Sequence, residues 1–285
     1  MSTFNQLDSG RKRIILLLLG FGFADTLIAF VGYGQLEQAV NARTAITDIE
    51  VMVTAGIAAV LSCVIVARQG LSGLHGKTYA ALAIGTILWL SGEIVWTYYE
   101  VILNVELPSY SLADIFWISG YGFFGYHLFK TYSYFARSVN KITNIGVGII
   151  AGLAIAYLIY QMFIVSEFDG IADIMTFIFR SSYPVGDLVL IVPSTLLLIT
   201  LRKAKLHFSP WFFISLSLLV TSAADSVFSY LSVVSQSEIE WIANILYDSA
   251  NLCMAGGLFW YNRYVILDTS KLNSVERMQS DMDNK

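Results

Sequence analysis

Long apolar stretches separated by short polar segments fill almost the whole chain. An α-helix that crosses the hydrocarbon core of a bilayer, about 30 Å thick, needs roughly 20 apolar residues. We identify eight such stretches, at 14–34, 49–68, 79–101, 112–131, 144–165, 184–201, 211–234 and 240–262. Their apolar runs are too long and continuous for the alternating pattern of membrane β-strands. The pattern therefore predicts an all-α, polytopic membrane protein with eight transmembrane helices.

The positions of Lys and Arg predict how these helices are oriented. All basic residues except Arg43 and Arg180 fall at the termini or in the connections that share their side of the membrane. The opposite connections carry mostly acids. Because positive residues are enriched in cytoplasmic loops, we predict that both termini are cytoplasmic and that the protein lies in the plasma membrane.

Residues 1–265 are interpreted as a single transmembrane helical bundle, and 266–285 as a short polar cytoplasmic tail that we expect to be disordered. The start of the chain permits another interpretation. Basic residues 11–13 followed by an apolar run resemble a signal peptide, with 39–42 as its cleavage region. Asp25 interrupts that run, so we expect 14–34 to span the membrane; cleavage would leave seven spans and an external amino terminus.

Composition excludes several classes of protein. Apolar residues make up 56% of the chain and charged residues only 13%, against about 25% charged in soluble domains. The sequence has no phosphate-binding or dinucleotide fingerprint, no basic, aromatic-rich patch for nucleic acid, and no mid-span lysine for a retinal Schiff base. Its two cysteines form no CxxC motif, and its three histidines are scattered. We therefore predict no catalytic motif, metal or cofactor, and the lipid bilayer as the main partner.

Six acids lie within the predicted spans or at their mouths: Asp25, Glu93, Asp114, Asp187, Asp225 and Asp248. An ionisable residue at the centre of a span costs about 2.5–3.5 kcal/mol, and such residues usually face the bundle interior and serve function. With the predicted orientation, all six fall in the outer half of the bilayer. The sequence therefore predicts an outward-facing acidic pocket.

Helical periodicity places these acids beside other polar and aromatic residues. Glu93 shares a helical face with Trp96, and Asp248 shares one with Asn244 and Asn251. A tyrosine hydroxyl is a suitable buried partner for a carboxylate, and Trp117, Tyr121, Tyr183, Tyr230, Tyr247, Tyr98 and Trp96 flank the acids. The predicted ligand- or ion-binding residues are Glu93, Asp225, Asp248, Asp114, Asp187, Asp25, Trp96, Asn244, Asn251 and Tyr183.

Each acid also has a structural interpretation. Asp114 follows Ser111 at the spacing of a capping box. Asp187 follows Pro184, which suits the first turn of a helix, where the helix dipole favours an acid by about 0.3–1 kcal/mol. The mid-span acids could be structural groups bonded to hydroxyls. The sequence leaves these alternatives open.

Two pairs of predicted helices show a possible internal repeat. SGEIVWTYYEV at 91–101 aligns with SAADSVFSYLS at 222–232 when Glu93 is set on Asp225. With a two-residue gap, ADIFW at 113–117 then aligns with ANILY at 243–247. The spans at 79–101 and 112–131 and those at 211–234 and 240–262 are possible duplicated helical hairpins. Such repeats are common in transporters, where the binding site lies between them.

Three short motifs resemble membrane-embedded input regions of bacterial diguanylate cyclases and histidine kinases. They are LPSYSLADIFWISGY at 107–121, YPVGD at 183–187 and WIANILYDSANL at 241–252. The resemblance covers about 80–265 and implies a sensory role. The chain departs from that family in lacking an attached output domain, so signalling would require a separate cytoplasmic protein.

We therefore expect a membrane sensor-like or ligand-binding protein that takes an unknown small ligand or cation on its outer side. The alternative is a cation- or proton-coupled secondary transporter, since mid-span carboxylates relay ions and protons. The inner halves of the predicted spans show few polar groups, which argues against transport. A membrane enzyme or a subunit of a larger complex is a third possibility.

Overall fold

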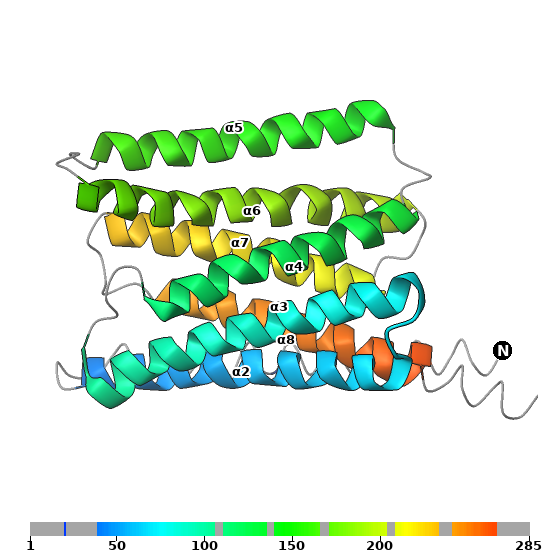
Figure 1. Cartoon of the computed structure of the whole chain (residues 1–285), viewed down its shortest axis with the longest axis horizontal. Helices are drawn as coiled ribbons and strands as arrows, with labels where there is room; N and C mark the ends of the chain where they lie inside the picture. Colours follow the sequence, from blue (N-terminus) through cyan, green and yellow to red (C-terminus); the bar gives the residue numbers. More distant parts are fainter. Residues whose placement is uncertain are drawn as a thin grey trace, which may run out of the picture.

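The computed structural model describes residues 39–105, 111–135, 140–165, 171–203, 209–233 and 241–266, together with Gly20. Within these ranges the chain is helical and contains no strand (Figure 1). This confirms the all-α prediction. The helices are α2 (Ala39–Gln69), α3 (Gly73–Thr97), α4 (Leu112–Phe135), α5 (Lys141–Val165), α6 (Ile171–Lys203), α7 (Pro210–Val233) and α8 (Trp241–Trp260). Short π-helical segments, Tyr98–Leu103 and Tyr261–Ile266, extend α3 and α8.

Four of the described helical segments are long and apolar enough to cross a bilayer. They are Ala45–Gln69, Gly73–Leu103, Ser181–Lys203 and Pro210–Leu231. Lys141–Leu153 is a shorter apolar helical segment. These segments indicate a membrane protein. The predicted first span, 14–34 with Asp25, and the tail beyond Ile266 lie outside the described residues.

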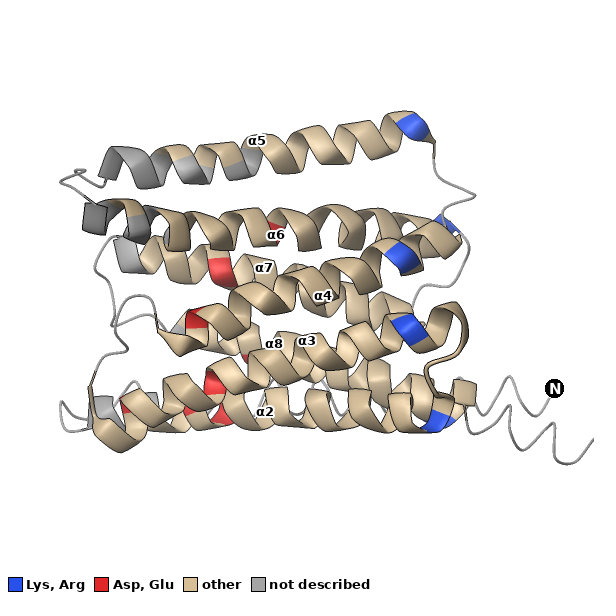
Figure 2. Cartoon of the chain, viewed as in Figure 1, with Lys and Arg blue, Asp and Glu red and all other residues tan. Residues whose placement is uncertain are grey.

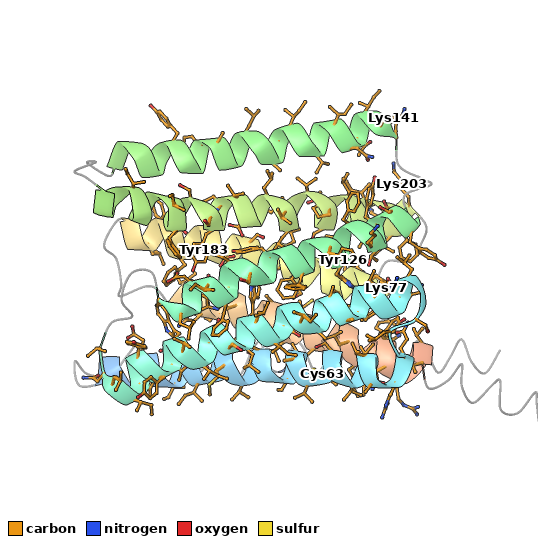
Figure 3. All side chains as sticks on the ribbon, in the orientation of Figure 1. Cys63, Lys77, Tyr126, Lys141, Tyr183 and Lys203 are labelled. Atoms are coloured by element: carbon orange, nitrogen blue, oxygen red, sulfur yellow. The ribbon has the colours of Figure 1, made fainter. Side chains whose placement is uncertain are left out.

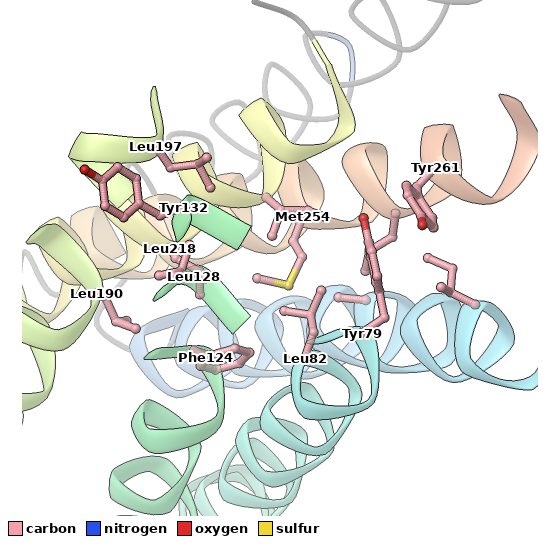
Figure 4. Close-up of a cluster of buried hydrophobic side chains, with 14 of the residues drawn as sticks. Tyr79, Leu82, Phe124, Leu128, Tyr132, Leu190, Leu197, Leu218, Met254 and Tyr261 are labelled. Carbon is pink, nitrogen blue, oxygen red and sulfur yellow. The ribbon is translucent and has the colours of Figure 1, made fainter. Parts of the chain in front are cut away.

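Six of the helices form a closed ring. Helix α2 packs on α3, α3 on α4, α4 on α6, α6 on α7, α7 on α8, and α8 returns to α2. Consecutive helices run in opposite directions, and α5 lies outside the ring against α6 (Figure 1). Buried side chains from all six ring helices fill its interior, including Leu82, Phe124, Leu190, Leu218 and Met254 (Figure 4).

The structure corrects two predicted helix starts. Helix α2 begins at Ala39 rather than 49, and α6 begins at Ile171 rather than 184. Pro184 therefore lies inside α6, and Asp187 is several turns from its start, so Asp187 does not cap a helix. A proline removes one backbone hydrogen bond, and neighbouring helices in a bundle can compensate for that loss.

Helices α3 and α4 pack closely through two reciprocal glycine–tryptophan contacts. A Cβ atom at Gly120 of α4 would lie 2.4 Å from the Trp89 ring of α3. A Cβ atom at Gly92 of α3 would lie 2.4 Å from Nε1 of Trp117 in α4. Trp89 also donates a hydrogen bond from Nε1 to the carbonyl oxygen of Trp117, at 3.0 Å. Only glycine leaves room for the two indole rings at this crossing.

Candidate functional site

Charged side chains are separated along the length of the bundle. The Lys and Arg residues coloured in Figure 2 gather at one end, which we call the basic end, and the coloured Asp and Glu residues lie in the other half, the acidic half. Arg43 and Arg180 instead fall toward the starts of α2 and α6, on the opposite side. Lys77, Lys141 and Lys203 mark the basic end, and Tyr183 lies in the acidic half (Figure 3).

Asp225 of α7 lies at the centre of a hydrogen-bonded group in the acidic half. Its Oδ2 accepts a hydrogen bond from the hydroxyl of Tyr121 in α4, at 2.7 Å. Its Oδ1 accepts one from the hydroxyl of Tyr247 in α8, at 2.6 Å. The Tyr121 oxygen also lies 3.4 Å from Oδ1 of Asp187, an α6 residue that is only 2% exposed. One phenol therefore brings together carboxyls from two helices.

Asp114 takes part in both of the arrangements that its sequence allowed. Its Oδ2 accepts hydrogen bonds from the backbone N–H and the hydroxyl of Ser111, at 2.8 Å and 2.9 Å. This is the capping role. Its Oδ1 accepts a hydrogen bond from the hydroxyl of Tyr183 in α6. The same carboxylate thus starts its own helix and joins α4 to α6.

Glu93 of α3 accepts a hydrogen bond on Oε1 from Nε1 of Trp117 in α4, at 3.0 Å. The Trp117 ring centroid lies 5.9 Å from that of Trp96, which in turn lies 6.0 Å from that of Phe228. Glu93 therefore bonds the first of three aromatic rings, from three helices, that lie in a row. We use the name acid–aromatic cluster for the four carboxyls and their donors: Glu93, Asp114, Asp187, Asp225, Trp117, Tyr121, Tyr183 and Tyr247.

Three other predicted site residues, Asn244, Asp248 and Asn251, form a second group, the α2–α8 seam. The side-chain amide of Asn244 donates to the hydroxyl of Thr47, at 3.1 Å. The Thr54 hydroxyl lies 2.7 Å from Oδ1 of Asp248 and accepts from the Asn251 amide, at 3.3 Å. Asp248 is 2% exposed. The sequence placed all these residues in one site. In the structure the bonds of Asn244, Asp248 and Asn251 cross the α2–α8 interface, whereas those of the acid–aromatic cluster join α3, α4, α6, α7 and α8.

The sequence missed the α2 partners in this seam. The predicted span starts at 49, so Thr47 and Asp48 fall outside it, yet both are buried within α2. Their signal is the row of small and polar residues, continued by Thr54, on one face of that helix. Conversely, two tyrosines that the sequence predicts beside the acids lie outside the cluster: Tyr98 is 50% exposed and Tyr230 is 65% exposed.

In the acid–aromatic cluster the hydrogen-bond donors are neutral Tyr and Trp side chains, whereas the acceptors are carboxyl groups that can carry a negative charge. Burying a carboxylate without compensating partners is costly, and Tyr and Trp supply only single hydrogen bonds. A cation placed among these carboxyls would compensate their charge more fully than the phenols do. No group of three or more His, Cys, Asp and Glu side chains with metal-binding geometry occurs in the described ranges.

Family models, curated proteins and solved structures yield no match to this chain. The arrangement of its own side chains therefore carries the functional argument.

Proposed function

We propose that the protein is a multi-pass membrane sensor that binds a cationic ligand in the acid–aromatic cluster and signals to a separate cytoplasmic partner. One observation carries the proposal: Asp225 and Asp187, from different helices, approach the same Tyr121 hydroxyl. Acids gathered in this way inside an apolar bundle are a binding site by default. A cation between them would replace the phenol as their common partner.

The proposed topology has eight spans, with both termini in the cytoplasm. Under it, the basic end faces the cytoplasm, as the positive-inside rule requires, and the acidic half faces outward. The gathering at one end of the Lys and Arg residues coloured in Figure 2 supports this orientation. The stretch 14–34 supplies the eighth span.

We also propose that the bundle contains duplicated helical hairpins, α3–α4 and α7–α8. Two hydrogen bonds support this, because they occupy equivalent places in the two hairpins. The alignment sets Glu93 on Asp225 and Trp117 on Tyr247. Trp117 of α4 donates to Glu93 of α3, and Tyr247 of α8 donates to Asp225 of α7. The same register sets buried residues of α4 on buried residues of α8: Ala113, Phe124 and Leu128 on Ala243, Met254 and Leu258.

This repeat makes the two sides of the ring comparable. The α4–α6 interface is held by Asp114, Asp187 and two tyrosines, whereas the α2–α8 seam includes the amides Asn244 and Asn251. The α4–α6 interface is therefore the one whose bonds a cation would disturb directly. The α2–α8 seam would hold the two hairpins together while the opposite interface changes.

The aromatic rings favour an organic or alkali cation over an anion. Aromatic faces attract cations through their quadrupoles, by about 0.5–2 kcal/mol, and Trp117, which bonds Glu93, belongs to a row of rings with Trp96 and Phe228. On binding, Asp225 would exchange its Tyr121 bond for the cation, and α4 would lose a connection to α7. That loss would reach the basic end along the rigid helix α4. The resemblance to bacterial input regions supports a sensory use of this change.

A cation- or proton-coupled transporter is the second candidate. It is favoured by polar side chains buried between the acidic half and the basic end, among them His127 and Ser217. The sequence pattern predicts few polar groups in the inner halves of the spans, which argued against transport. The buried His127 and Ser217 weaken that objection.

The proposal predicts ligand-dependent stabilisation that requires the cluster acids. A saturating cation from a panel of Na⁺, Ca²⁺ and ethylammonium is expected to raise the free energy of unfolding by about 2.7 kcal/mol at a hundredfold excess over Kd. The double variant Glu93→Gln/Asp225→Asn should fold but lose this increment. Thermal unfolding in nanodiscs measures both.

The matched control is Asp281→Asn/Asp283→Asn, which removes two acids from the polar tail and should keep the full response. The proposal fails if no cation of the panel stabilises the wild-type chain. It also fails if the cluster double variant responds as the wild type does.

A further inference from the structure

Four fully buried polar side chains lie between the acidic half and the basic end. They are Tyr79 of α3, His127 of α4, Ser194 of α6 and Ser217 of α7, each at most 1% exposed. The Tyr79 hydroxyl, Nε2 of His127 and the two serine hydroxyls have no hydrogen-bond partner within the part of the chain that the structure describes. We call this set the inner polar level.

Positions along the helices set Ser217, Ser194 and His127 at similar depth, and a ring contact brings Tyr79 beside His127. Ser217 lies eight residues before Asp225 on α7, about 12 Å along the axis, and Ser194 lies seven residues after Asp187 on α6, about 10 Å. His127 lies six residues after Tyr121 on α4, about 9 Å. In each case the step leads from the acid–aromatic cluster toward the basic end.

The hydrogen bond that His127 makes to the backbone determines which of its two ring nitrogens carries the hydrogen. Its Nδ1 lies 3.0 Å from the carbonyl oxygen of Thr78. A carbonyl only accepts, so Nδ1 carries the hydrogen and Nε2 of the neutral ring is an acceptor. The ring centroid of Tyr79 lies 5.4 Å from that of His127, edge to face. An acceptor and a phenol thus lie side by side on neighbouring helices.

The Ser217 hydroxyl differs from those of its neighbours on α7. Ser215 and Ser222 of α7 donate to the carbonyl oxygens four residues earlier, as helical serines commonly do. Ser217, between them, makes no such bond. Buried polar groups are almost always hydrogen-bonded, and internal water supplies the partner where protein does not. Four unpartnered groups from four helices therefore indicate a site for ordered water.

We propose that the inner polar level binds water and connects the acid–aromatic cluster to the basic end as a path for protons across the bundle. Asp225 and Asp187 form its outer entrance, and water bridges the gap to Ser217 and Ser194. Each hydroxyl or water takes up one proton and releases another, so no group is consumed. Carboxylates and histidines in membrane bundles commonly serve as proton relays.

The path continues from the inner polar level toward the basic end. His75 lies one helical turn before Tyr79 on α3 and is only partly buried. Its ring centroid lies 6.4 Å from that of Trp211, whose Nε1 also has no partner among the described residues. His75 can therefore exchange protons with bulk water and with the interior. The inference does not depend on whether the cluster also binds a ligand.

The test is proton flux into proteoliposomes loaded with a pH-sensitive dye, driven by a potassium diffusion potential set with valinomycin. We expect flux above that of protein-free liposomes. The variants Asp225→Asn and Ser194→Ala/Ser217→Ala should each reduce it by at least about tenfold, because each interrupts the relay. Ser215→Ala, an equally buried serine on α7 that already has a protein partner, should conduct as the wild type does.

Monodisperse elution before reconstitution confirms that each variant is folded. Wild-type flux equal to that of protein-free liposomes would overturn the proposal. So would a serine double variant that conducts like the wild type, since the waters would then serve only to stabilise the fold. Equal losses in Ser215→Ala and in the double variant would indicate a packing defect and would also contradict a specific path.

Discussion

Replacing Tyr121 by phenylalanine is expected to lower the free energy of unfolding by about 2–3 kcal/mol. The substitution keeps the ring and removes only the hydroxyl that donates to Asp225 and approaches Asp187. A buried hydrogen bond to a carboxylate contributes about 1.5–3 kcal/mol, and its loss leaves an acceptor without its partner. Equilibrium unfolding in mixed detergent micelles, followed by circular dichroism, measures the change.

Tyr126→Phe is the matched control, because Tyr126 lies on the same helix but is 41% exposed at the surface. A substitution of that kind usually changes stability by less than about 0.5 kcal/mol. If both variants lose the same stability, the Tyr121 hydroxyl does not hold α4 to α6 and α7 as the structure indicates.

Gly120→Ala is the second substitution with a large expected effect, a loss of about 2–3 kcal/mol. The new Cβ would lie 2.4 Å from Cδ1 and Nε1 of Trp89, far inside van der Waals contact. Trp89 cannot withdraw freely, because it donates to Trp117 and its ring packs edge to face on Phe124, with centroids 4.6 Å apart. Overpacking of this kind costs typically about 1–3 kcal/mol. Unfolding in the same micelles measures it.

Gly122→Ala, two residues further along α4, should have the opposite sign. A Cβ at Gly122 meets nothing within 4 Å, and alanine is favoured over glycine in a helix by about 0.8–1 kcal/mol. The packing account is contradicted if Gly120→Ala is as stable as the wild type, or if both alanines lower stability equally.

The length of the apolar stretches was sufficient to predict the described helices, because a membrane span needs a run of roughly 20 apolar residues. It placed the starts of α4, α5, α7 and α8 to within three residues and that of α3 six residues late. It failed at α2 and α6, where polar residues such as Asp48 and a proline at 184 interrupt the apolar run although the helix continues. Such interruptions are tolerated only because other helices cover them, and one sequence does not reveal that cover.

The acids of the candidate site could be predicted from their rarity in apolar spans, and tyrosine could be predicted as their partner. Their pairing could not. Whether Tyr121 meets Asp187 and Asp225 depends on how the ring closes, with α4 on α6 rather than on α5. For the same reason Asp248, predicted beside Asp225, instead bonds Thr54 of α2 across another interface.

The most direct test of the central claim, that the acid–aromatic cluster binds a cation, is a calorimetric titration. The cation that stabilises the wild-type chain is titrated into the wild type and into Asp225→Asn in nanodiscs. Truncating one partner of a buried charge pair typically costs about 2–5 kcal/mol, and 1.4 kcal/mol is tenfold in Kd. The account predicts saturable binding that weakens at least about tenfold in Asp225→Asn. The same affinity in both chains would contradict it.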